Sequence, residues 1–117
     1  MHALIIEQDI WITLMIEDVL RELGYTSFAH PASDDEAMAA AEARRPDLIT
    51  SDVRSDTRSG VEAVRRICSA RAIPVVFVTS TPWEVRAVDA DATVVPKPFA
   101  GEMLKHGVTR AIAALAG

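Results

Sequence analysis

Short apolar runs alternate with longer segments of helical spacing along the chain, and this alternation restricts the fold more than any other feature. The apolar runs, each long enough for one strand, cover residues 2–6, 25–29, 47–51, 75–79 and 92–95. The segments of helical spacing are residues 10–23, 33–44, the stretch after Gly60, 82–88 and 100–116. This order predicts an α/β fold, a parallel sheet with helices on both faces. Right-handed crossovers leave only a few doubly wound strand orders.

Local signals predict where individual helices begin and end. Ser33 and Glu36 have the spacing of a capping box and are expected to open the second helix. Gly24 is expected to end the first. The segment 82–88 has room for one or two helical turns, so the fourth helix is expected to be short. The first helix is predicted to point a stripe of apolar residues inward: Ile12, Met15, Ile16, Val19, Leu20 and Leu23.

Size and charge narrow the class of protein. The chain has 117 residues, of which 50% are hydrophobic and 25% charged, and this fits one globular domain over residues 1–117. A net charge of −5 argues against nucleic-acid partners and anionic membranes, and the apolar runs are too short to span a bilayer. We therefore expect a cytoplasmic monomer. Cys68 is expected to be a small core residue rather than a catalytic thiol.

Polar residues follow four of the five predicted strands. They are Glu7, Gln8 and Asp9 after the first strand, Asp52 after the third, Thr79 and Ser80 after the fourth, and Lys97 after the fifth. In open α/β sheets ligands bind beyond the carboxyl ends of the strands, so carboxylates, a hydroxyl and a lysine are expected to meet in one crevice. The sequence has no glycine-rich phosphate loop and no G-x-S-x-G elbow.

Four stretches in this order resemble the receiver domains of two-component response regulators. They are Leu4-Ile5-Ile6-Glu7-Gln8-Asp9, Pro46 to Val53 with Gly60 eight residues after Asp52, Pro74 to Ser80, and Lys97-Pro98-Phe99. The resemblance covers essentially the whole chain. It implies a flavodoxin-like, five-stranded, doubly wound parallel sheet with strand order 2-1-3-4-5.

The resemblance also implies a role for each crevice residue. Asp52 would be the phosphoacceptor, Thr79 would bond the phosphoryl group and Lys97 would supply positive charge to it. The ligands of Mg²⁺ would be Glu7, Gln8, Asp52 and the backbone carbonyl of Arg54. The Lys97–Pro98 bond is a candidate cis bond.

The chain departs from the family pattern at several positions. Gln8 stands where the family usually carries a second acidic residue, so Mg²⁺ binding is expected to be weakened. Asp9 is expected to point elsewhere and not to replace that acid. Val94 occupies the place of the family's switch aromatic, and Thr79 and Lys97 are about one helical turn closer in sequence than in typical receivers.

Each assignment has a plainer alternative. Asp52 would be an acid that is never phosphorylated, Glu7 a solvated loop acid, Gln8 a hydrogen-bonding filler, Thr79 a β-branched strand residue, and Lys97 a surface lysine. Together these alternatives describe an interaction module whose function does not depend on phosphorylation.

A surface outside the crevice is predicted to dock a partner. In the family, the first helix and the loop after the fifth strand meet the helical phosphotransfer domain of a histidine kinase. The corresponding patch here is Ile10, Trp11, Leu14, Pro98 and Phe99. The alternative is a set of ordinary exposed apolar residues. Trp83 is expected to be a packing residue.

The sequence is compatible with three functions. The first is a stand-alone receiver, not an enzyme, that accepts a phosphoryl group from a histidine kinase or histidine phosphotransfer protein and acts as relay, phosphate sink or protein-binding switch. Because the sequence ends at Gly117, after the last predicted helix, no output domain is expected. The second is the phosphorylation-independent module, and the third a small flavodoxin-like enzyme or cofactor binder.

Overall fold

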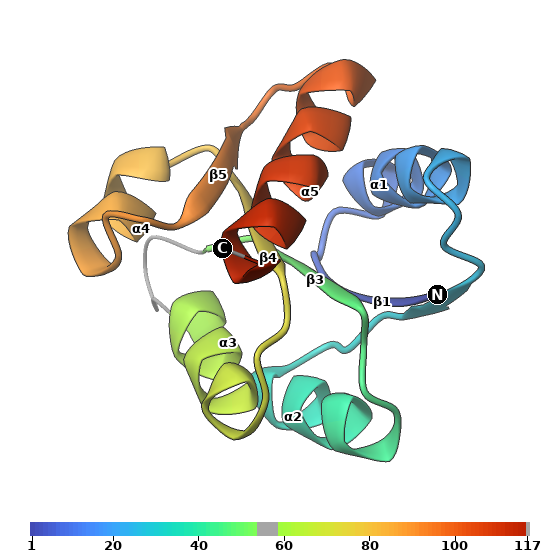
Figure 1. Ribbon diagram of the computed structural model, residues 1–117, viewed down its shortest axis with the longest axis vertical. Coiled ribbons are helices and arrows are strands. Elements are labelled where there is room, and N and C mark those ends of the chain that lie inside the picture. The colour runs from blue at the N-terminus through green and yellow to red at the C-terminus, as the bar shows by residue number, and fades with distance from the viewer. Residues whose placement is uncertain (54–58, 117) are drawn as a thin grey trace.

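Five parallel strands form one sheet with the order β2-β1-β3-β4-β5 (Figure 1). The computed structural model describes residues 1–53 and 59–116. The strands are β1 (His2–Ile6), β2 (Ser27–Ala29), β3 (Leu48–Ser51), β4 (Val75–Thr79) and β5 (Thr93–Pro96). The flavodoxin-like strand order predicted from the sequence is confirmed. All strands run the same way, so their carboxyl ends lie along one edge of the sheet.

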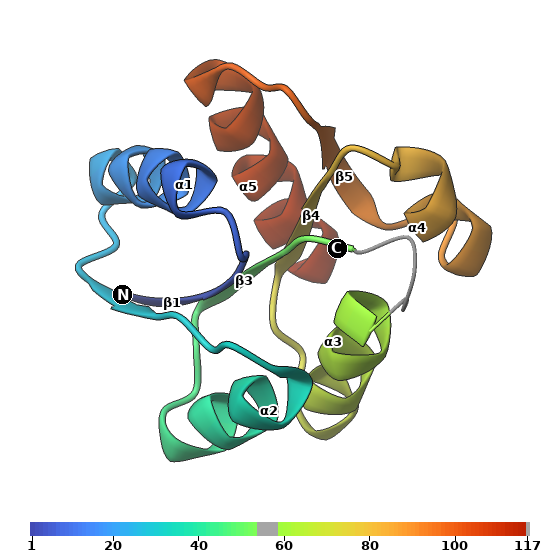
Figure 2. The same cartoon turned by 180° about the vertical axis from the view of Figure 1, so that it is seen from behind.

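Helices cover both faces of the sheet, as Figure 1 and the reverse view in Figure 2 show. The helices are α1 (Ile10–Glu22), α2 (Asp34–Ala43), α3 (Ser59–Ala70), α4 (Pro82–Val88) and α5 (Gly101–Ala116). One face carries α1 and α5, and the opposite face carries α2, α3 and α4. Within the described residues, no helix combines the length and apolar character needed to cross a bilayer.

The alternation of side chains along each strand creates two hydrophobic cores, one on each face. In β1, Ala3 and Ile5 pack in the core under α1 and α5, whereas Leu4 packs in the core under α2, α3 and α4. Because both faces are buried, the strands read as continuous apolar runs rather than alternating ones. The sheet is thus held rigidly on both sides, and its carboxyl edge provides fixed positions for polar side chains.

Helices α4 and α5 contact β4 and β5, the two strands at one edge of the sheet. The predicted short fourth helix is confirmed, because α4 has seven residues and buries Val85. Helix α5 approaches the sheet at Gly107, where a Cβ atom would lie 2.7 Å from Val95 Cγ2. A side chain at this position would therefore push α5 away from β5.

Two predictions about packing are wrong. Met15, expected on the inward stripe of α1, is 45% exposed, because the buried stripe of α1 contains Thr13 instead. Trp83, expected to pack, is 64% exposed, because in α4 it is Val85 that points to the core. Ser33 caps α2 as predicted, with the Glu36 N–H donating to Ser33 Oγ at 3.1 Å. The Glu36 carboxylate accepts the N–H of Ala32 at 3.1 Å, one residue before the N-cap, so the capping box is made in its first bond only.

Candidate functional site

Lys97 lies between two carboxylates that follow the ends of other strands. Its Nζ is 2.7 Å from Glu7 Oε1 and 3.5 Å from Asp52 Oδ1. The Glu7 side chain is 3% exposed, Lys97 is 15% exposed and Asp52 is 21% exposed. A buried carboxylate is stable only when it is paired, and the ammonium group provides that pairing. The structure therefore brings together three predicted site residues, and Glu7 is not a solvated loop acid.

Main-chain hydrogen bonds between strand ends hold these residues in place. The Asp52 N–H donates to Ile6 O at 2.9 Å, which aligns the end of β3 with the end of β1. The Lys97 N–H donates to Thr79 O at 2.8 Å, which aligns β5 with β4. The Lys97–Pro98 peptide bond is cis, as the sequence suggested. Strand pairing thus sets the spacing of the carboxylates, the ammonium and Thr79.

Asp9 belongs to the first helix and not to the crevice. Its Oδ1 accepts the N–H groups of Trp11 at 2.9 Å and Ile12 at 3.3 Å, which caps α1. Its own N–H donates to Glu7 Oε2 at 3.1 Å. The expectation that Asp9 points elsewhere is correct, since its carboxylate is engaged at the helix N-terminus.

Thr79 is fully buried at the end of β4, next to the segment that follows β3. Its hydroxyl donates to Val53 O at 3.4 Å, one residue after Asp52. The hydroxyl also contacts Thr81 Oγ1 at 3.2 Å and accepts the Thr81 N–H at 3.1 Å. A buried hydroxyl beside the Asp52 segment can bond an anionic group held on that carboxylate.

The donor set suits a magnesium ion that keeps most of its waters. Mg²⁺ in proteins is commonly held by one or two carboxylates with water completing the octahedron. Glu7 and Asp52 are two carboxylates close enough to share one ammonium. Gln8 follows Glu7 in the sequence, is exposed and can offer an amide oxygen. Arg54, the remaining predicted ligand, lies outside the described residues, among which no cluster of three or more His, Cys, Asp or Glu side chains forms a metal site.

The predicted docking residues are exposed to different degrees. Trp11 is 75% exposed, Ile10 is 61% and Leu14 is 45%, and Pro98 is exposed as well. Phe99 is partly buried and packs against the core under α1 and α5. The Glu7–Lys97 contact joins the loop before α1 to the loop after β5. The α1 residues of the patch and the residues after β5 therefore follow two loops that are in contact.

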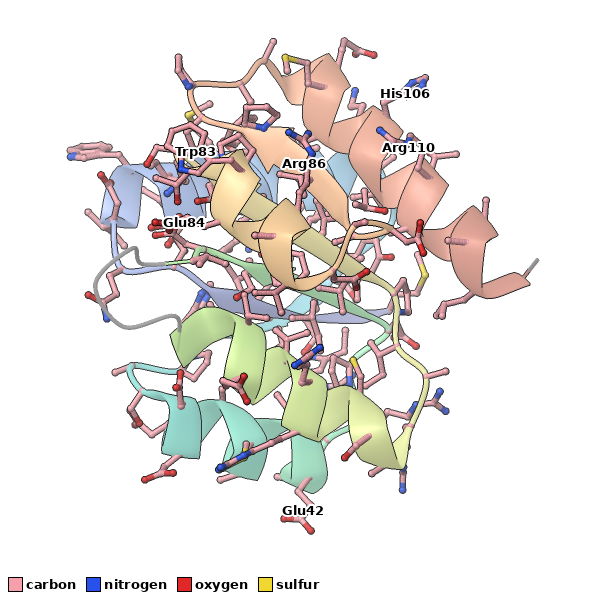
Figure 3. All side chains as sticks on the ribbon, turned by 90° about the vertical axis from the view of Figure 1, so that its left-hand side faces the viewer. Glu42, Trp83, Glu84, Arg86, His106 and Arg110 are labelled. Atoms are coloured by element: carbon pink, nitrogen blue, oxygen red, sulfur yellow. The ribbon has the colours of Figure 1, made fainter. Side chains whose placement is uncertain are left out.

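Two polar residues beyond Thr79 were missed from the sequence. Thr81 Oγ1 donates to Glu84 Oε2 at 3.0 Å, and this pair continues the contact from Thr79 into α4. Figure 3 labels Glu84 in the first turn of that helix, beside Trp83. The available signal was the spacing Thr81-x-x-Glu84, which by itself predicts only a helix cap.

Cys68 is unsuited to act as a nucleophile. Burial raises the pKa of its thiol, which lowers the fraction of reactive thiolate. Its Sγ donates weakly to Ile73 O at 3.8 Å, and the side chain packs against the core under α3. The interpretation of Cys68 as a packing residue agrees with this position.

Similarity to known proteins shows the family to which this chain belongs. The sequence matches the response regulator receiver domain over residues 3–109. The chain belongs to this family. A receiver domain of the response regulator PhyR from Erythrobacter litoralis, solved by NMR, superposes with a TM-score of 0.81 at 29% identity, covering 96% of this chain and 89% of that one.

Curated relatives place the receiver in two-component signalling. The transcriptional regulatory protein PdtaR of Mycobacterium tuberculosis is 35% identical over 102 residues, which cover 84% of this chain and 50% of PdtaR. A protein-glutamate methylesterase/protein-glutamine glutaminase of Hahella chejuensis is 30% identical over 105 residues, covering 84% of this chain and 30% of that protein. The receiver thus spans half or less of the length of these curated relatives.

Proposed function

We propose that residues 1–117 form one receiver domain that accepts a phosphoryl group on Asp52 from a phosphohistidine. The donor is a histidine kinase or a histidine phosphotransfer protein, and the chain acts as relay, phosphate sink or protein-binding switch. The observation that carries the proposal is the Lys97 ammonium, held between the carboxylates of Glu7 and Asp52. It places positive charge beside a carboxylate that must approach an anionic phosphoryl group.

The proposed transfer balances without any further reactant. A carboxylate oxygen of Asp52 forms a bond to phosphorus while the phosphorus–nitrogen bond of the donor breaks and its electron pair returns to the imidazole. Lys97 neutralises charge on the phosphoryl oxygens, and the Thr79 hydroxyl donates a hydrogen bond to one of them. Mg²⁺, when bound, reduces the repulsion between the two anions. Glu7, Gln8 and Asp52, with the Arg54 carbonyl, are the proposed ligands.

The proposal assigns a signalling role and not an enzymatic one. The methylesterase named in Hahella chejuensis is matched over only 30% of its length, and the crevice of this receiver contains two carboxylates, a lysine and a threonine hydroxyl. These groups suit covalent modification of the chain's own aspartate followed by hydrolysis.

Intact-mass spectrometry tests the proposal. Incubation with Mg²⁺ and acetyl phosphate is expected to add the mass of one phosphoryl group, and hydroxylamine is expected to remove it, because an acyl phosphate is cleaved by that nucleophile. Peptide mapping after borohydride reduction is expected to locate the modification at Asp52. If no mass is gained from acetyl phosphate or from any phosphorylated histidine phosphotransfer protein, the phosphorylation-independent interaction module is the better description.

Trp11 is expected to carry much of the binding energy for the donor protein. Replacing Trp11 by alanine should lower kcat/KM for transfer from a phosphorylated histidine phosphotransfer protein by about tenfold or more, because exposed aromatic residues dominate such interfaces. Transfer from acetyl phosphate should stay unchanged. The matched control is Trp83→Ala, which removes a second exposed tryptophan, from α4. Equal losses in both variants would contradict the proposed patch.

A further inference from the structure

Thr81 and Glu84 have the spacing of a capping box but do not form one. In a capping box the N-cap hydroxyl accepts the N–H three residues on, and the carboxylate there accepts the N-cap N–H. Ser33 and Glu36 make the first of these bonds at the start of α2. Thr81 makes no side-chain cap bond at the start of α4. The Glu84 N–H donates to the Thr81 carbonyl instead, at 3.0 Å.

The Thr81 N–H and the Thr81 hydroxyl, which take no part in a capping box, both contact Thr79 Oγ1. The Thr81 N–H, which a capping box would direct to the carboxylate, donates to Thr79 Oγ1 at 3.1 Å. The Thr81 hydroxyl lies 3.2 Å from Thr79 Oγ1 and 3.0 Å from Glu84 Oε2. The result is a chain of three side chains that runs from the buried end of β4 to the first turn of α4.

The number of hydroxyl protons decides which group donates and which accepts along the Thr79–Thr81–Glu84 hydrogen-bond chain. A hydroxyl has one proton and an ionised carboxylate has none, so the proton between Thr81 and Glu84 comes from Thr81. Thr81 Oγ1 can then only accept from Thr79. The single hydroxyl proton of Thr79 is therefore directed to Thr81 Oγ1 or to Val53 O, and in both cases it points to a protein acceptor.

We infer that Glu84, acting through Thr81, is a positioning residue that opposes the turn of the Thr79 hydroxyl toward a phosphoryl group on Asp52. This inference rests on the proposed function. When Thr79 donates to a phosphoryl oxygen, neither Val53 O nor Thr81 Oγ1 receives its proton, and the hydrogen bonds that link the end of β4 to the first turn of α4 are rearranged. Phosphorylation is in this way coupled to α4 by side-chain hydrogen bonds, in a receiver whose switch-aromatic position is Val94.

Glu84→Gln is expected to reverse the donor-to-acceptor direction of the Thr79–Thr81–Glu84 hydrogen bonds. The amide nitrogen of glutamine can donate to Thr81 Oγ1, which lets Thr81 donate to Thr79. The Thr79 proton then no longer points to Thr81 and keeps only its longer contact of 3.4 Å with Val53 O within the described residues. The variant is expected to bind beryllofluoride, in the presence of Mg²⁺, about threefold to tenfold more tightly, the effect of one net hydrogen bond. Thr81→Val removes the link, so adding Glu84→Gln in that background should cause no further change.

Trp83 reports the expected movement of α4. In a Trp11→Phe background, the fluorescence of Trp83 is expected to change on addition of beryllofluoride, since this exposed side chain is adjacent to Glu84 (Figure 3). In the protein without any phosphoryl analogue, Glu84→Gln is expected to shift the amide NMR signal of Thr81. The charge-matched control is Glu42→Gln, which removes an exposed carboxylate from α2, far from α4 in Figure 3.

The outcomes separate this inference from the proposed function. Tighter binding in Glu84→Gln that disappears in the Thr81→Val background supports the inference. If Glu84→Gln acts equally in both backgrounds, or Glu42→Gln has the same effect, the inference is overturned while phosphorylation of Asp52, measured by intact mass, stands. If the wild-type chain gains no phosphoryl mass, both are overturned.

Discussion

Asp52→Asn is expected to abolish phosphoryl incorporation, lowering the rate by at least about a thousandfold, the scale of loss when a covalent nucleophile is removed. The asparagine has the shape of aspartate but lacks the negative charge and nucleophilicity of the carboxylate. The main-chain bond from position 52 to Ile6 O is unaffected, and Lys97 keeps its closer contact with Glu7. The variant should therefore be folded and inactive as an acceptor.

The measurement is intact mass after incubation with acetyl phosphate and Mg²⁺, alongside thermal unfolding of both proteins. A suitable control is Asp35→Asn, which removes an exposed carboxylate from the first turn of α2 and should leave incorporation unchanged. Incorporation into Asp52→Asn at the wild-type rate would show that a different residue accepts the phosphoryl group.

Gln8→Asp is expected to tighten Mg²⁺ binding by about tenfold or more. Unit charges 4 Å apart interact by about 4 kcal/mol at an effective dielectric of 20, and exposure of position 8 reduces this gain through screening. The added carboxylate would follow Glu7 in the sequence, and Lys97 neutralises the charge of Glu7 and Asp52 only in part. Isothermal titration calorimetry with MgCl₂ measures the change.

Gln8→Asn is the matched control for this substitution, because asparagine and aspartate differ in charge and hardly in size. It should bind Mg²⁺ no more tightly than the wild type. Equal affinities for Gln8→Asp and Gln8→Asn would mean that position 8 does not face the metal, and the departure of Gln8 from the family pattern would then have no effect on cation binding.

Most of the fold was predictable because its signals are local and repeated. Strands buried on both faces give continuous apolar runs, and Ser33 with Glu36 marks the start of α2. Exposure of single side chains was less predictable. Met15 and Trp83 were expected to be buried, yet a helix turns different residues to the core according to how it is tilted and what it packs against.

The candidate site was predictable in its members but not in its contacts. The parallel sheet alone implies that residues after the strands share one edge, so Glu7, Asp52 and Lys97 could be grouped. The pairing of Lys97 with Glu7 at shorter distance than with Asp52 depends on side-chain positions 90 residues apart. The Thr79–Thr81–Glu84 chain was hidden for a different reason, since its spacing is also that of a helix cap.

The largely buried Glu7–Lys97 pair gives Lys97 a part in folding in addition to its proposed part in phosphoryl transfer. Removing one partner of a buried ion pair typically costs about 3–5 kcal/mol, because the other charge is left without compensation. With Glu7 only 3% exposed, a neutral residue at position 97 would leave such a charge behind. Inactivity of a Lys97 variant would therefore combine loss of the proposed contact with the phosphoryl group and a smaller folded fraction, and simultaneous neutralisation of Glu7 separates the two contributions.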